Sequence, residues 1–537
     1  MQTTFPQPAL EPSFEGNHTG RRSIAKVLFD HVVNFTGVGL VCAVAYFDPG
    51  NWGVDLQAGS EFGYRLLFVV LLAGVFAVFL QVLASKLGVV TGLDLASHCR
   101  LLLHDRPNHT RLWRWLALYP LYALSEIAIV STDLAELLGS AMALCMLFPK
   151  LPLWAGVVIT SSDVLFILAL GDPLRGRPAR FFEAIIAGLV LAVLICMCII
   201  ISKVDVRWDD AFKGFVPSKY IFQHGGLYTS VGIIGATVMP HSLFIGSALA
   251  TQDRMSSLQD LARWLMSRLR SAGPVNSEQY SSSHPKNHLE RENNSFAFVR
   301  THLYHGIADL VVSLMGFAVI INSLILILAS AVFYYGSGEL GDSASLFDAY
   351  DLLKELLGSG AATIFALALL CAGQGSSIIA TVAGQTVSEG FIHWRISPVL
   401  RRLVTRLIGL VPSTIVAVAV GRPGINSLLV ISQVILSIVL PFIVLPLLLL
   451  TSSKTVMRVR HPDADKSVMK DSSESSLQLD TDTVTSNLDV DVERAEMDGW
   501  IDMSNGVVVA GIGWAIWLLV LVANGYVLVV LMMGQES

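Results

Sequence analysis

Asp48-Pro49-Gly50-Asn51 and Met239-Pro240-His241 are two short interruptions, each inside an apolar segment long enough to cross a bilayer. In both, the proline removes a helical hydrogen bond and clashes with the preceding turn, so each segment is predicted to be a broken helix. Within hydrocarbon, unwound backbone is tolerated only where protein or a water-filled cavity satisfies it. Interruptions at matching places in two halves of a chain indicate the binding site of a secondary transporter.

The side chains at these interruptions favour a divalent transition metal as the ligand. An ionised carboxylate near the middle of a bilayer is costly unless it is paired, so Asp48 requires a cation, a proton or a basic partner. Asn51 adds an amide oxygen, and His241 adds an imidazole. The Met239 thioether is a poor ligand for Ca²⁺ or Mg²⁺ but suits softer transition ions. Two structural alternatives stay open, an ion pair at Asp48 and simple packing of the methionine.

The composition predicts an all-α, polytopic membrane protein. Hydrophobic residues make up 53% of the 537 and charged residues only 15%, against roughly 25% charged in soluble domains. The formal net charge of −6 gives no indication that the protein binds nucleic acid. Eleven apolar runs are predicted to span the lipid bilayer, at residues 33–61, 66–90, 115–141, 150–170, 181–202, 227–250, 303–334, 357–388, 403–421, 425–451 and 505–533.

The spans divide the chain into two halves, at residues 33–202 and 227–451, followed by an eleventh helix at 505–533. A polar tail at 1–32 has no apolar core of a signal peptide. Two long connections, at 252–300 and 458–500, are predicted to be disordered because they contain too few large apolar residues to fold. They are either sites for a kinase or a ubiquitin-ligase adaptor, or solvated tethers.

The orientation follows from the positive charges. Lys and Arg concentrate in the connections on one side of the spans, for example at 100–114, 175–180 and 254–270. This asymmetry places the N-terminus and both long loops in the cytosol and, with eleven spans, the C-terminus outside. This orientation is compatible both with the plasma membrane and with an endosomal or vacuolar membrane.

The third span carries three acids on one helical face. Asp133 and Glu136 are three residues apart, and Glu126 lies seven residues before Asp133. Acids inside a membrane that face a histidine such as His241 and an arginine such as Arg406 are typical of proton relays. The alternative is a purely structural ion-pair network that holds span 3 to span 9.

Seven short motifs occur in order over about four hundred residues, and together they resemble the Nramp family (natural resistance-associated macrophage proteins) of proton-coupled divalent-metal transporters. The likeness runs from about residue 35 to 451, more loosely to 533, and is greatest to the fungal members. It implies two inverted five-helix repeats, spans 1–5 and 6–10, of the LeuT type. The motifs lie at residues 48–51, 88–92, 126–136, 235–241, 372–385, 405–406 and 432–442.

The resemblance also implies the roles of individual residues. The implied metal ligands are Asp48, Asn51, Met239, the backbone carbonyl of Ala236 and, in the occluded state, Gln433. The implied proton pathway leads to the cytosol through Asp48, His241, Asp133, Glu136 and Glu126, with Arg406 as a fixed counter-charge. Gly246 departs from the pattern, because many relatives have a second histidine there. Proton coupling is then looser or differently routed.

The expected function is proton-coupled transport of Mn²⁺ and Fe²⁺ toward the cytosol by alternating access, with Co²⁺, Cd²⁺ and Zn²⁺ as further candidates. Apart from these transported ions, no cofactor is expected. A LeuT-type amino-acid symporter is disfavoured because the Asp48 carboxylate would repel the carboxylate of its substrate. A receptor derived from a transporter is disfavoured by the intact ligand set. An enzyme is not supported, because the chain has no His-Glu-x-x-His motif, phosphate loop or nucleophile elbow.

Overall fold

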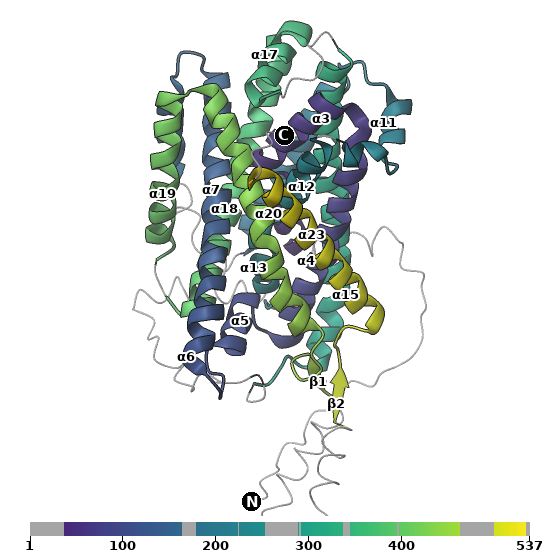
Figure 1. The fold of residues 1–537 in the computed structure, drawn as a ribbon, viewed down its shortest axis with the longest axis vertical. Helices are drawn as coiled ribbons and strands as arrows, with labels where there is room; N and C mark the ends of the chain where they lie inside the picture. Colours follow the sequence, from purple (N-terminus) through teal and green to yellow (C-terminus); the bar gives the residue numbers. More distant parts are fainter. Residues whose placement is uncertain are drawn as a thin grey trace, which may run out of the picture.

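The computed structural model describes residues 37–163, 179–223, 225–252, 288, 291–336, 344–394, 397–461 and 499–532, which form a helical bundle (Figure 1). Its first half consists of α2 (Val38–Val44), η1 (Ala45–Phe47), α3 (Pro49–Phe62), η2 (Gly63–Leu66), α4 (Leu67–Thr91), α5 (Leu95–Leu103), α6 (Thr110–Trp113), η3 (Arg114–Leu118), α7 (Tyr119–Leu147), α8 (Leu153–Thr160), η4 (Ser161–Asp163) and α10 (Ala179–Ile201).

Two short helices, α11 (Trp208–Gly214) and η5 (Lys219–Phe222), lie between the two halves. The remaining helices are α12 (Gly226–Thr237), α13 (Pro240–Leu249), α15 (Phe296–Ser313), η7 (Leu314–Val319), α16 (Ile320–Ala329), η8 (Ser330–Tyr334), α17 (Leu346–Leu357), α18 (Ser359–Ile392), α19 (Pro398–Ala419), α20 (Arg422–Thr451) and α23 (Val507–Met532).

Seven helical stretches among the described residues are long and apolar enough to cross a membrane, and three shorter apolar helices accompany them. The protein is therefore an all-α, multi-pass membrane protein, as the composition predicted. Large apolar side chains on α19, such as Leu407, Val411 and Ile415, are exposed, which is expected of a surface that faces lipid. The number eleven stays a prediction, because part of the fourth predicted span lies outside the described residues.

Both predicted helix breaks are confirmed. Asp48 has an extended backbone (φ −64°, ψ 167°) between η1 and α3, and Pro49 is the first residue of α3. Met239 is likewise extended (φ −76°, ψ 121°) between α12 and α13, and Pro240 begins α13. Proline suits the first turn of a helix because the backbone N–H it lacks would have no helical partner there. Each break thus ends one half-helix and starts the next.

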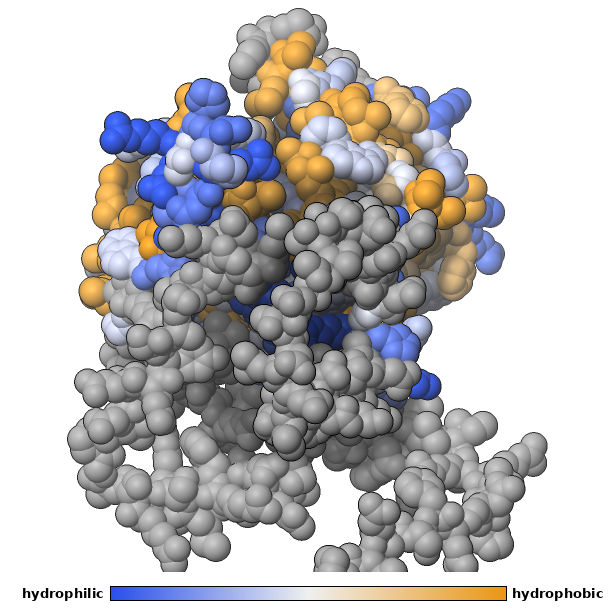
Figure 2. Space-filling model, turned by 90° about the horizontal axis from the view of Figure 1, so that it is seen from below, coloured by the Kyte–Doolittle hydropathy of each residue, from blue (hydrophilic) through white to orange (hydrophobic). Residues whose placement is uncertain are grey.

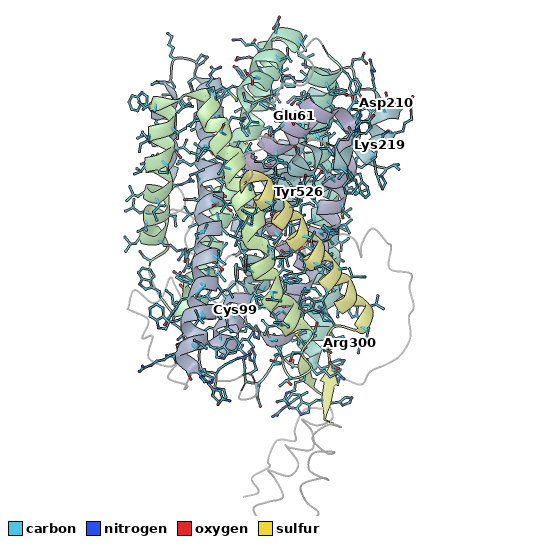
Figure 3. The ribbon with its side chains drawn as sticks, in the orientation of Figure 1. Glu61, Cys99, Asp210, Lys219, Arg300 and Tyr526 are labelled. Atoms are coloured by element: carbon cyan, nitrogen blue, oxygen red, sulfur yellow. The ribbon has the colours of Figure 1, made fainter. Side chains whose placement is uncertain are left out.

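Two ends of the bundle can be distinguished. Cys99 of α5 and Arg300 of α15 lie at one end, whereas Glu61, Asp210 and Lys219 lie at the other (Figure 3). The end with α5 also carries a small sheet, in which β1 (Arg458–Arg460) pairs antiparallel with β2 (Trp500–Asp502). Seen from this end, both hydrophilic and hydrophobic residues are visible (Figure 2).

The two long connections are shorter than the sequence predicted. In the second one, Val459 is buried and the Arg458 guanidinium lies 4.4 Å from the Trp500 ring, so packing orders both ends of the expected loop into the sheet. In the first one, α15 begins at Phe296, inside the predicted range 252–300. Residues 1–36, 253–287, 289–290 and 462–498 lie outside the described residues, and with them most of the segments that were predicted to be disordered.

Candidate metal site and proton pathway

The two helix breaks meet at Asn51. Its Nδ2 donates to Asp48 Oδ1 (2.8 Å) within the first break and to the Ala236 carbonyl (2.9 Å), which is near the end of α12. The Asn51 backbone N–H also donates to Asp48 Oδ1 (2.9 Å), so the carboxylate caps α3. All three residues are buried. The structure therefore brings together three of the five predicted metal ligands.

Gln433 of α20 lies against the first turn of α3. A Cβ added to Gly50 would lie 1.8 Å from Gln433 Nε2, so the glycine leaves the space that this side chain fills. Gln433 Oε1 and Asp48 Oδ2 are both buried and have no hydrogen-bond partner. Burying an unpartnered polar atom is costly, and two such oxygens beside a helix break fit the requirements of a cation.

Met239 is fully buried at the second break. Its carbonyl accepts a hydrogen bond from Ser242 Oγ (2.7 Å), and this hydroxyl is in turn 2.7 Å from the Tyr46 hydroxyl. The break in span 6 is thus fixed to η1, which immediately precedes the break in span 1. The predicted ligands at the two breaks thus provide a carboxylate, an amide, a freed carbonyl and a thioether.

His241 links the second break to the acidic helix α7. Its Nδ1 lies 3.2 Å from Thr132 Oγ1, and this hydroxyl donates its hydrogen to the Ala128 carbonyl (3.0 Å). The imidazole must therefore donate Nδ1–H, which leaves Nε2 as an acceptor. Nε2 is buried and has no hydrogen-bond partner.

The predicted pairing of span 3 with span 9 is present at Asp133. Arg406 Nη1 donates to the Asp133 carbonyl (3.0 Å) and lies 3.6 Å from Asp133 Oδ1. Arg406 Nη2 also donates to Ser377 Oγ of α18 (2.6 Å). Both members of the ion pair are at least 98% buried. Glu136, one turn further along α7, is fully buried too.

Glu126 does not pair with Arg406. Its two carboxylate oxygens accept from Arg401 Nη2 at 2.9 and 2.7 Å. The carboxylate is 24% exposed, so this pair lies nearer the surface than the Asp133 pair. The Arg401–Glu126 and Arg406–Asp133 pairs therefore join α7 and α19 at different depths.

Comparison with known proteins identifies the family. The family model described as natural resistance-associated macrophage protein-like (Nramp) matches residues 39–462. The chain is 41% identical over 503 residues to the manganese transporter pdt1 of Schizosaccharomyces pombe, with 93% of this chain and 85% of that protein covered. The chain belongs to the Nramp family.

Other relatives agree with this assignment. This Nramp chain is 39% identical over 444 residues to the iron transporter SMF3 of Saccharomyces cerevisiae, with 82% of the chain and 85% of that protein covered. It superposes on the crystal structure of a mutant manganese transporter of Eremococcus coleocola with a TM-score of 0.69 at 29% identity, covering 98% and 92% of the two chains. The predicted family, including its fungal members, is confirmed.

In this Nramp chain, an amide fills the space beside Gly246. A Cβ at Gly246 would lie 1.5 Å from Gln81 Nε2 of α4. Gln81 Oε1 accepts from the Tyr46 hydroxyl (3.1 Å), and Gln81 Nε2 lies 3.2 Å from Cys42 Sγ. A network without a titratable imidazole thus joins α4, η1 and α2 at this position.

Sequence reasoning missed several residues of this Nramp site. Arg401 was not singled out as a partner of Glu126, because the sequence does not show how the helix that contains Arg401 faces span 3. Gln81 and Tyr46 gave no signal, because a lone amide or phenol in an apolar span is compatible with packing. Gln374 of α18 also gave no signal, and its Nε2 donates to Ser140 Oγ of α7 at 3.4 Å.

Proposed function

We propose that this Nramp chain transports divalent transition-metal ions, principally Mn²⁺ and Fe²⁺, toward the cytosol with coupled movement of protons. Co²⁺, Cd²⁺ and Zn²⁺ are further candidate substrates. The names of the relatives support Mn²⁺ and Fe²⁺, since pdt1 is named as a manganese transporter and SMF3 as an iron transporter. The single observation that carries the proposal is the pair of buried, unpartnered oxygens, Asp48 Oδ2 and Gln433 Oε1, where two broken helices meet.

The proposed ligands are Asp48, Asn51, the Ala236 carbonyl, Met239 and Gln433. Asn51 Nδ2 donates to two of the oxygens that an ion would bind, Asp48 Oδ1 and Ala236 O. An arriving cation takes over both acceptors, and the amide then turns so that its Oδ1 faces the ion. The amide nitrogen thus holds both oxygens at one place until the ion binds. The Met239 sulfur adds preference for transition ions over Ca²⁺ and Mg²⁺.

Protons follow a separate set of residues in this proposal. A divalent ion at Asp48 favours loss of any proton from that carboxylate, because metal ligands must be deprotonated. His241 Nε2 is an unprotonated acceptor, and its Nδ1 contacts Thr132, the residue before Asp133. Glu136, Asp133 and Glu126 follow one another along α7 toward the surface, with Arg406 as the counter-charge of Asp133. Because position 246 has no imidazole, protons leave through these acids.

The proposed orientation places the N-terminus and the end with α5 in the cytosol and the C-terminus outside. It rests on the Lys- and Arg-rich connections. The two long loops would then be accessible to a kinase or a ubiquitin-ligase adaptor. Plasma membrane, endosome and vacuole are all compatible with this orientation.

The function is tested with purified protein in liposomes that contain a pH-sensitive dye. An inward Mn²⁺ gradient should drive metal uptake together with acidification of the interior. Asp48→Asn should abolish both signals, whereas Asp210→Asn, a matched change of an exposed acid, should preserve them. Uptake of an amino acid would support the symporter instead, and Mn²⁺ binding without uptake would support a receptor. Either result would overturn the proposed function.

A further inference from the structure

The end of α4 is capped by residues that are two hundred positions away in the sequence. The last carbonyls of a helix have no partner within it. Here the Val89 carbonyl accepts from Asn294 Nδ2 (2.8 Å) and the Val90 carbonyl from the Asn294 backbone N–H (3.1 Å). Arg291 Nη2 donates to the next two carbonyls, those of Thr91 (3.2 Å) and Gly92 (2.9 Å).

The shape of α4 is adapted to this cap. Gly92 has a left-handed conformation (φ 64°), which favours glycine, and a Cβ there would lie 2.8 Å from Asn294 Oδ1. Gly92 is the last residue of the motif 88–92, for which the proposed metal site and proton pathway provide no role. The capping residues continue directly into α15, whose N-cap is Ser295. We call His288 together with residues 291–294 the strap.

A histidine pair also attaches the strap to α5. The planes of the His288 and His98 rings are 4° apart and their centroids 5.2 Å apart, and His288 Nε2 lies 3.0 Å from His98 Nδ1. Thr91 Oγ1 donates its hydrogen to the Leu87 carbonyl (2.7 Å), so His98 Nε2–H must donate to Thr91 Oγ1 (2.8 Å). His98 Nδ1 then accepts from His288. Burial lowers the pKa of both imidazoles, which favours their neutral forms.

The strap connects to the small sheet on its other side. Asn293 Nδ2 donates to the Val456 and Arg458 carbonyls, both at 2.7 Å. Glu292 pairs with Arg460 of β1 at 3.0 Å, although both side chains are largely exposed. The same sheet joins residues 458–460 to residues 500–502. The strap thus lies where the two long connections meet the helical bundle.

From α4 the contacts lead to the second helix break. A Cβ at Gly88 would lie 2.1 Å from the Ser247 carbonyl of α13, so α4 and α13 are in backbone contact. The Leu95 N–H at the start of α5 donates to Ser247 Oγ (2.9 Å). α13 begins directly after Met239 and contains His241. The position of this half-helix therefore depends on the position of the end of α4.

We propose that Arg291 and Asn294 are positioning residues for transport, which hold the end of α4 and thereby α13 in place at the cytosolic end of the molecule. This inference rests on the proposed function for its effect on transport. The residues contact neither the ion nor its ligands. Their removal loosens α4, α5 and α13 at this end and changes the rate of the transport cycle, while the ligand set stays intact.

The native Cys99 of α5 reports directly on this end of the molecule. It is 1% exposed, and burial raises the pKa of its thiol. Reaction with a maleimide, measured at Cys99 by mass spectrometry, should therefore be slow in the parental protein. Arg291→Ala and Asn294→Ala should accelerate it by about threefold or more, a factor that corresponds to the net loss of one hydrogen bond. Arg291→Lys, which keeps a charged donor, should restore part of the protection.

Arg300→Ala is the matched control, because Arg300 is an exposed arginine nine residues further along the same segment. It should leave Cys99 labelling at the parental rate. In liposomes, Arg291→Ala and Asn294→Ala should change the Mn²⁺ turnover rate by about threefold or more, with the dissociation constant for Mn²⁺ kept within about twofold. This separation of turnover from binding distinguishes a positioning role from damage to the metal site.

The proposal would be overturned if both alanine variants kept the parental rate of Cys99 labelling and the parental turnover rate. It would also be overturned if Arg300→Ala accelerated Cys99 labelling as much as they do. Should Asn294→Ala not yield folded protein, Asn294→Ser, which also keeps the backbone donor to Val90 and retains a hydroxyl, gives the same comparison. If the parental chain transports no metal, the proposed function fails. Cys99 labelling still decides whether the strap holds this end of the molecule in place.

Discussion

The break in span 1 and the break in span 6 have the same backbone design but contribute different chemistry. Each consists of one extended residue followed by a proline that starts the next half-helix. Asp48 caps its own half-helix through its side chain and brings a formal charge. Met239 makes no side-chain cap, and its break brings neutral donors, a freed carbonyl and a sulfur. The difference suggests that span 1 provides affinity and span 6 provides selectivity.

The largest effect is expected from Asp48→Asn, which removes the charge and keeps the shape. Mn²⁺ uptake should fall below detection, because no other ligand in the proposed set is charged. Uptake into liposomes, with thermal unfolding as the check on folding, measures this. Near-parental uptake by a folded variant would show that the first break does not bind the ion.

Gly50→Ala should weaken Mn²⁺ binding by roughly tenfold, about 1.4 kcal/mol. The new Cβ would take the place of Gln433 Nε2, so the amide must move away from the first break. Because the displaced atom ends a flexible side chain, stability should change little. Isothermal titration measures the affinity. Gly53→Ala is the control, because its new Cβ would contact Leu429, which lies on α20 as Gln433 does. Equal losses in both variants would contradict a ligand role for Gln433.

Met239→Ala should leave considerable Mn²⁺ transport but allow Ca²⁺ or Mg²⁺ to compete. Selectivity is a difference between two affinities, and the thioether disfavours the hard ions more than it favours Mn²⁺. Competition of Ca²⁺ with Mn²⁺ uptake measures this change. Unchanged rejection of Ca²⁺ would mean that Met239 only packs in the core and that selectivity arises elsewhere.

Gly246→His should have the smallest effect on binding, because it adds an imidazole roughly two helical turns beyond the second break. By itself it collides with Gln81, so turnover should decrease modestly. The double variant Gly246→His/Gln81→Ala removes the collision and should recover turnover, with a pH dependence that the parental protein lacks. Turnover measured between pH 5.5 and 7.5, around the usual pKa of histidine of about 6.5, tests this. Additive losses in the double variant would refute the exchange of amide for imidazole.

Local chemistry made much of this structure predictable. The two breaks follow from proline and from polar residues inside apolar runs, so the sequence was sufficient to place them. Contacts that depend on how helices rotate against one another were not accessible. Arg401 reaches Glu126, and Gln81 fills the space at Gly246, only because of the positions of α19 and α4. The cap of α4 by Asn294 joins residues about two hundred positions apart, and no local pattern encodes it.

The most direct test of the account concerns Asp133, which lies outside the proposed ligand set but on the proposed proton pathway. Mn²⁺ affinity and the ratio of protons to metal transported are measured together for the parental protein and for Asp133→Asn. The account predicts that affinity stays within about twofold while the proton-to-metal ratio falls clearly. A tenfold loss of affinity, about 1.4 kcal/mol, with an unchanged ratio would contradict it. The acids of α7 would then be structural partners of α19.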